Sequence, residues 1–141
     1  MTAHGFIPPH GNYRELLVWQ KAYQLCRGVY EATSAFPKEQ RFGLQSQMRR
    51  AAVSVPSNIA EGYGRHSTAS YVQSLLVAYG SLCELETQLM LAADLGYTKP
   101  ADSELCREHI GHVERMLMAL VKALRKKSKP LESSNPRILE S

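Results

Sequence analysis

The chain has 141 residues, of which 44% are hydrophobic and 21% charged, and its formal net charge is +4 at pH 7. This length suits one domain, and the composition is that of an ordinary soluble globule. No run of about 18 apolar residues is present, which argues against a membrane-spanning helix. The first residues lack a signal-peptide pattern, and the three cysteines lack the spacing of metal ligands. We therefore expect a cytoplasmic protein with reduced thiols and no membrane partner.

The first helical pattern follows an N-terminal segment, 1–15, that is predicted to be an irregular arm because it is rich in proline and glycine. From residue 16 onward, apolar residues recur three and four apart in two adjacent seams. One seam comprises Val18, Ala22, Leu25, Val29, Ala32 and Phe36, and the other comprises Trp19, Tyr23, Cys26 and Tyr30. Such a wide apolar face suits a helix that packs against two neighbours and ends at Pro37. The aromatic residues fit a core or an interface better than a base-stacking platform.

A second helix is predicted over residues 44–63, after a short polar connection over 38–43. Pro56 lies in its middle. Proline removes one backbone donor and crowds the preceding turn, so we expect a kink or a break near Ser54. The glycines at 62 and 64 allow the helix to stop.

One face of this second helix carries polar residues three or four positions apart. They are Arg50, Ser54, Asn58, Glu61 and Arg65. One interpretation is an intramolecular network, in which Glu61 pairs with an arginine and Ser54 or Asn58 bonds the carbonyl freed by the proline. A second interpretation places these residues at an interface between subunits. A third is a direct site for a ligand or a nucleic acid.

The third helix is predicted over residues 67–93, with Ser67 or Thr68 as its cap. Its apolar residues are Tyr71, Leu75, Ala78, Leu82, Leu85, Leu89 and Ala92. Thr98 is the expected cap of a fourth helix that runs to residue 127. Its apolar residues are Cys106, Ile110, Val113, Leu117, Leu120 and Leu124.

The predicted fold is all-α, an up-down antiparallel four-helix bundle over residues 16–127, because four amphipathic helices are joined by short connections. The last segment, 128–141, is rich in serine and proline and has little to bury. We expect it to be a disordered tail.

Basic residues form the other candidate site. They are Arg49, Arg50, Arg65, Lys122, Arg125, Lys126 and Lys127. Clusters of this kind neutralise phosphates and favour a nucleic-acid-binding surface. A run of lysines at a helix end is also typical of a solvated terminus.

The sequence offers no convincing catalytic or metal site. The spacing Cys106-x-x-His109-x-x-His112 has no second group of ligands elsewhere in the chain. The glycine pair at 62 and 64 follows a helix, which is the wrong context for a nucleotide loop. We therefore predict no enzymatic activity, no metal and no cofactor.

Three runs of the sequence occur in an order that is specific to one family. They are LVWQKAYQLCRGVYEATSAFPKEQRFGL, QMRRAAVSVPSNIAEGYGR and LLVAYGSLCELETQLMLAADLGY. Over residues 16–124 the chain resembles the bacterial four-helix-bundle family of 23S rRNA intervening-sequence proteins. The resemblance implies a helical subunit that assembles into a ring, with a pentamer expected, and a link to RNA. At fold level the family is similar to the accessory protein of diversity-generating retroelements, which partners a reverse transcriptase and nucleic acid.

From these observations we expect a non-enzymatic homo-oligomer that binds nucleic acid, above all RNA, through a basic surface. The alternative is a scaffold that binds a protein partner and has no role with nucleic acid. In that case its positive charge is incidental.

Overall fold

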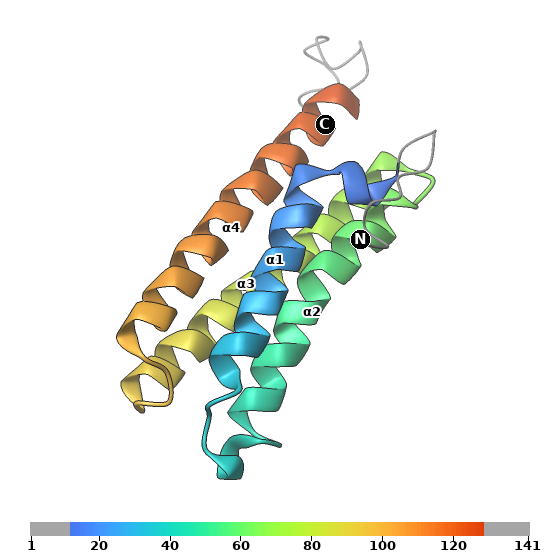
Figure 1. Cartoon of the computed structure of the whole chain (residues 1–141). Helices are drawn as coiled ribbons and strands as arrows, with labels where there is room; N and C mark the ends of the chain where they lie inside the picture. The colour runs from blue at the N-terminus through green and yellow to red at the C-terminus, as the bar shows by residue number, and fades with distance from the viewer. Residues whose placement is uncertain (1–11, 129–141) are drawn as a thin grey trace, which may run out of the picture.

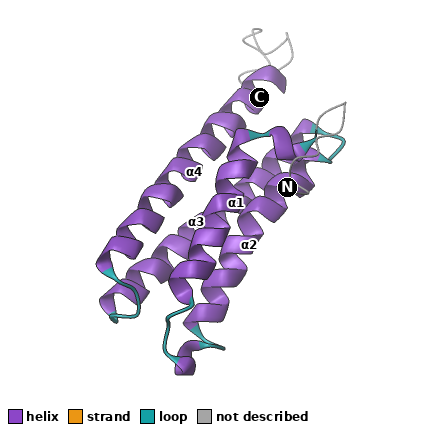
Figure 2. Ribbon diagram, viewed as in Figure 1, coloured by secondary structure: helices purple, strands orange, loops and turns teal. Residues whose placement is uncertain are grey.

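Four helices make up most of the protein in the computed structural model, which describes residues 12–128 (Figure 1). They are α1 (Leu17–Thr33), α2 (Leu44–Tyr63), α3 (Thr68–Asp94) and α4 (Pro100–Ser128). The connections between them are short, and no described residue lies in a strand (Figure 2). The all-α prediction is therefore confirmed. Most of the predicted arm, 1–11, and nearly all of the predicted tail, 129–141, lie outside the described residues.

The helices form an up-down antiparallel four-helix bundle, as predicted. Each helix packs against the next along the chain, and α4 returns to pack against α1. The α1–α2 and α3–α4 connections lie at one end of the bundle, at the bottom of Figure 1. The α2–α3 connection and the end of α4 lie at the other end. None of the helices in the described part of the chain combines the length and apolar character needed to cross a membrane.

The core is built from one apolar face of each helix. Leu25 of α1, Val55 of α2, Leu82 of α3 and Leu117 of α4 are all fully buried. Spacings of three and four residues bring such side chains to one face of a helix, so the first predicted seam of α1 and the apolar faces of the other three helices form the bundle interior.

The second seam of α1 stays largely at the surface. Trp19 is half-buried between the ring of Tyr13, whose centroid lies 5.2 Å away, and that of Tyr23 at 5.1 Å. Tyr23 and Tyr30 remain 42% and 43% exposed. Tyr13 belongs to a 3-10 helix, Tyr13–Glu15, that continues the chain into α1. Two tyrosines at helical spacing are thus exposed on the outside of the bundle.

Two of the predicted helix ends are corrected by the structure. α1 ends at Thr33, before Pro37, and Phe36 leaves the helix to pack on Tyr97, with ring centroids 5.6 Å apart. α4 begins at Pro100, and the carbonyl of Lys99 accepts the first hydrogen bond of this helix, from the amide of Ser103 at 3.0 Å.

The predicted cap Thr98 is wrong, because its hydroxyl is buried without a hydrogen-bond partner among residues 12–128. The predicted cap Ser67 is confirmed, since its hydroxyl accepts a bond from the amide of Ser70 at 3.1 Å.

The predicted break in α2 at its proline is wrong. α2 continues through Pro56, which is buried, from Leu44 to Tyr63. Packing against α3 holds the helix together despite the missing donor, since α2 and α3 form the most extensive helix pair of the bundle.

Candidate nucleic-acid interface and polar network

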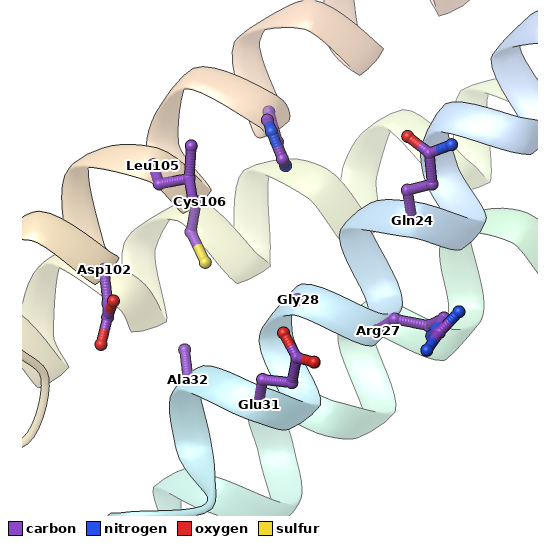
Figure 3. A pocket seen from close by; sticks show the side chains of 9 residues that line it. Gln24, Arg27, Gly28, Glu31, Ala32, Asp102, Leu105 and Cys106 are labelled. Atoms are coloured by element: carbon purple, nitrogen blue, oxygen red, sulfur yellow. The ribbon is translucent and has the colours of Figure 1, made fainter.

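A groove of about 360 Å³ runs between α1 and α4 (Figure 3). Gln24, Arg27 and Glu31 line its α1 side, and Asp102 and Cys106 come from α4. Burial, and to a lesser degree Asp102, raises the pKa of the Cys106 thiol. A thiol in such surroundings stays protonated at neutral pH and is a weak nucleophile.

The Cys106-x-x-His109-x-x-His112 spacing does not build a metal site in the structure. Cys106 is buried, whereas both histidines are exposed. Within residues 12–128, no three His, Cys, Asp or Glu side chains come together in a way that could hold a metal ion.

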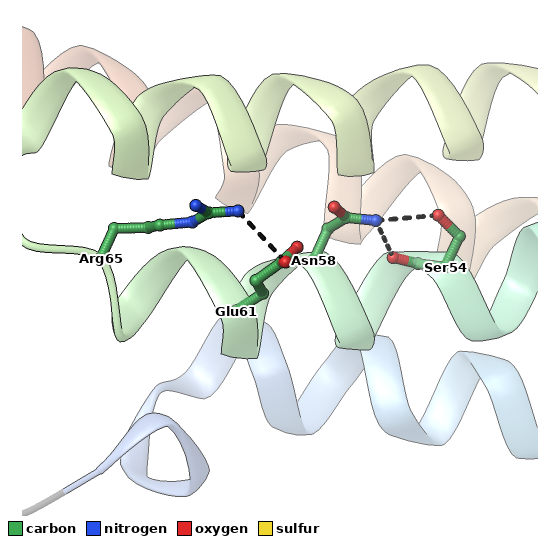
Figure 4. A network of polar contacts seen from close by, with 4 residues as sticks. All are labelled: Ser54, Asn58, Glu61 and Arg65. Atoms are coloured by element: carbon green, nitrogen blue, oxygen red, sulfur yellow. Dashed lines mark hydrogen bonds and ion pairs between the residues drawn. The ribbon is translucent and has the colours of Figure 1, made fainter.

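The polar face of α2 contributes a small network that reaches α3, and Figure 4 shows the two members on α2, Ser54 and Asn58. The hydroxyls of Ser54 and Ser81 lie 2.7 Å apart. The side-chain amide of Asn58 donates to the carbonyl of Ser54 at 2.8 Å and to its hydroxyl at 3.0 Å. These groups satisfy one another within one chain, in line with the intramolecular interpretation.

Pro56 leaves one carbonyl of α2 without an amide partner, and the network does not bond that carbonyl. An amide at position 56 would bond the carbonyl of Ala52, four residues earlier. Asn58 instead bonds the carbonyl of Ser54, and no side-chain hydrogen bond reaches Ala52 among the described residues. This part of the intramolecular prediction is therefore wrong.

The other members of the predicted polar face lie apart from this network. Glu61 and Arg65 form an ion pair at 3.1 Å, with side chains 59% and 47% exposed. Exposed pairs of this kind contribute less than about 1 kcal/mol. Arg50 is exposed about one turn before Ser54 and takes no part in the network. The five residues thus form two local pairs and a separate arginine, and a contact of any of them with a neighbouring subunit stays a prediction.

Arg49 has a structural role that the sequence did not indicate. Its Nε donates to the hydroxyl of Thr33 at 2.8 Å, and its Nη2 donates to the carbonyl of Tyr30 at 3.1 Å. Its guanidinium also lies 4.6 Å from the centroid of the Tyr30 ring. Carbonyls of the last turn of a helix lack amide partners, so Arg49 caps the end of α1 from α2.

A second groove, of about 460 Å³, lies beside this contact, where the end of α1 meets the start of α2. We call it the arginine groove. Its lining residues are Tyr30, Arg41, Phe42, Gln45, Ser46, Arg49, Arg50 and Val53. Phe42 is 87% exposed, and the guanidinium of Arg41 lies 5.4 Å from its ring centroid. Sequence reasoning missed Arg41 and Phe42, although three arginines and a phenylalanine fall within ten residues.

The predicted basic residues do not form one surface on a single subunit. Lys122, Arg125, Lys126 and Lys127 are exposed on the last turns of α4. Arg65 follows α2, at the same end of the bundle in Figure 1. Arg49 and Arg50 lie near the start of α2, toward the opposite end. The structure therefore presents two basic regions.

Glu114 of α4 is expected to make the stability of the bundle depend on pH. Partial burial, and secondarily the Glu86 carboxylate on α3, raises the pKa of Glu114 against the opposing effect of Arg115. A raised pKa in the folded state means that folding favours the protonated acid, so stability falls as pH rises through that pKa. We expect Glu114→Gln to be more stable than the parent at pH 7.

The gain from Glu114→Gln should disappear below about pH 4, where the parent carboxyl is protonated in both states. Urea unfolding at both pH values measures this difference. An equal gain at both pH values would mean that packing, and not ionisation, is responsible.

The comparisons with known proteins agree with this architecture. A search of curated proteins finds no match. Among solved structures, the chain is similar to the crystal structure of a protein with unknown function from the S23 ribosomal protein family of Bacteroides thetaiotaomicron. The TM-score is 0.69 at 20% identity, over 75% of this chain and 99% of that chain, which supports the fold. Residues 14–119 match the family described as 23S rRNA-intervening sequence protein. Because this match spans most of the sequence, the chain belongs to the 23S rRNA-intervening sequence protein family.

Proposed function

We propose that this protein is a non-enzymatic, cytoplasmic homo-oligomer, a pentamer, that binds nucleic acid, with RNA as the favoured class. The observation that carries the proposal is the basic end of α4. Its four cationic side chains, Lys122, Arg125, Lys126 and Lys127, are all exposed, and no acidic residue occurs between Arg115 and Ser128.

The proposed mechanism is electrostatic. Cationic side chains that neutralise phosphates release condensed counterions, so affinity falls linearly with the logarithm of the salt concentration. A ring of subunits would repeat the basic end of α4 once per copy. Binding of several weak sites to one strand raises the overall affinity without any new contact.

The exposed start of the second seam of α1 supports assembly. Tyr23, which lies outside the arginine groove, presents about two fifths of its surface to solvent in the single chain. Exposed aromatic side chains of this kind are enriched where proteins contact one another.

The test is binding of a fluorescent structured RNA across roughly 50 to 300 mM salt, with light scattering on the same sample. An oligomer whose affinity falls along a straight line in log salt supports the proposal. An oligomer that ignores RNA at the lowest salt contradicts it and leaves a scaffold for a protein partner.

Replacement of Lys122, Arg125, Lys126 and Lys127 by alanine should lower RNA affinity at least 10-fold and reduce the slope of the salt plot, because fewer counterions are released. The control replaces Lys99 and Arg107, two exposed cations nearer the start of α4, by alanine. If both variants bind as the parent does, the assignment of the α4 end is wrong.

A further inference from the structure

The arginine groove differs from the basic end of α4 because it combines charge with an open aromatic face. Phe42 is the most exposed of the large hydrophobic side chains in residues 12–128. Its neighbour Arg41 lies against its ring, while Arg49 lies against the ring of Tyr30. Two cation-aromatic pairs therefore border one groove.

The charge of this groove is uncompensated. Arg41, Arg49 and Arg50 line it together, and no lining residue is acidic. None of the three arginines forms an ion pair within the described residues. The hydrogen bonds of Arg49 go to neutral oxygens, so its charge is held in place without being neutralised. Three like charges around one groove suit an anionic ligand.

We propose that the arginine groove binds an unpaired nucleotide of single-stranded RNA, with the base stacked on Phe42 and the adjoining phosphates held by Arg41 and Arg50. This inference rests on the proposed function and names the form of nucleic acid that this groove takes.

The chemistry of the groove selects unpaired bases. Inside a duplex both faces of a base are covered by its neighbours, whereas a base in a loop or a single strand can place one face on an aromatic ring. The volume of about 460 Å³ falls in the usual range of about 300 to 1,000 Å³ for small-ligand pockets. A run of cationic side chains such as that of α4 contacts only phosphates, so the two basic regions differ in the part of the nucleic acid that they bind.

The experiment compares a labelled single-stranded RNA of about 12 nucleotides with the blunt duplex of the same sequence. Phe42→Ala should weaken single-strand binding about 5- to 100-fold, the usual contribution of one stacked base, and leave duplex binding unchanged. Leu95→Ala is the matched control, because Leu95 is also exposed, at the end of α3 near the same end of the bundle. That control should bind as the parent does.

Two further replacements separate stacking from apolar contact. Phe42→Trp keeps an aromatic face, so it should retain single-strand affinity, and its added tryptophan fluorescence should be quenched by bound RNA. Phe42→Leu keeps apolar volume without a ring and should behave as Phe42→Ala. Arg50→Gln should lower the salt slope by about one, with Arg107→Gln as the matched control.

Once circular dichroism shows that the variants are folded, each outcome either supports or overturns the binding of an unpaired base to Phe42. If the parent binds RNA but Phe42→Ala changes nothing, or weakens duplex binding equally, this inference is overturned and the proposed function stands. If Phe42→Leu retains full affinity, stacking is overturned. If Phe42→Ala lowers the mass of the oligomer, the groove is a subunit contact, which also overturns the inference. If no form binds RNA at about 50 mM salt, both proposals fail.

Discussion

Gly62→Val is expected to destabilise the bundle by about 3 kcal/mol, because α2 and α3 are too close at this point to admit a side chain. A Cβ atom at position 62 would lie 2.7 Å from the Cβ of Ser74 and 3.0 Å from Cδ1 of Tyr71. It would also lie 3.3 Å from the carbonyl oxygen of Tyr71. Backbone and Cβ atoms cannot turn aside as the end of a flexible side chain can, so the two helices must separate.

Gly80→Val is the matched control for this prediction. Gly80 lies inside α3, and nothing would approach a Cβ atom there within 4 Å. Its replacement should change stability by no more than about 0.5 kcal/mol. Urea unfolding followed by helical circular dichroism measures both variants. Equal midpoints for the two variants would mean that the close approach at Gly62 does not exist in solution.

Arg49→Ala is expected to cost about 2 to 3 kcal/mol, whereas Arg50→Ala should cost less than about 0.5 kcal/mol. The Arg49→Ala variant loses the two hydrogen bonds that the charged Arg49 side chain donates, to the hydroxyl of Thr33 and to the carbonyl of Tyr30. It also loses its contact with the Tyr30 ring, which contributes about 0.5 to 1 kcal/mol at an exposed site. Arg50 is exposed, and no hydrogen bond or ion pair joins it to another described residue.

Thermal unfolding at one matched protein concentration checks this pair of variants, because the proposed assembly would make stability depend on concentration. Arg49→Lys keeps the charge but not the planar donor geometry, so its stability should lie between those of the parent and Arg49→Ala. If Arg49→Ala and Arg50→Ala lose equal stability, the cap on α1 is not a stabilising contact. The difference also explains why Arg50, and not Arg49, is the residue to replace in binding experiments.

Most of the fold could be predicted from the sequence, because apolar residues three and four positions apart mark the buried face of each helix. The bounds of α2 agree with the prediction, since glycines flank the helix at positions 43 and 64. The end of α1 could not be predicted in the same way. Phe36 continues the apolar spacing of the helix, yet its ring packs on Tyr97, a partner 61 positions later that only the folded chain brings near.

The candidate sites were less predictable, because their partners come from other helices. Periodicity placed Ser54 and Asn58 on one face of α2, but gave no reason to choose Ser81 of α3 as the partner of Ser54. Arg49 and Arg50 looked equivalent in sequence. Their roles differ because one side chain reaches the end of α1 and the other points to solvent, which depends on how α1 and α2 cross.

The groove between α1 and α4 lies between the two α-helices that are farthest apart in the sequence. These two helices are the first and the last of the described chain, so the contact between them closes the longest loop and carries the largest closure entropy. By contrast, residues 64–67 alone connect α2 to α3. Contacts between helices that are close in sequence require less loop closure, so less entropy opposes their formation. A molecule lying along the α1–α4 groove would therefore stabilise the helix contact whose formation costs the most chain entropy.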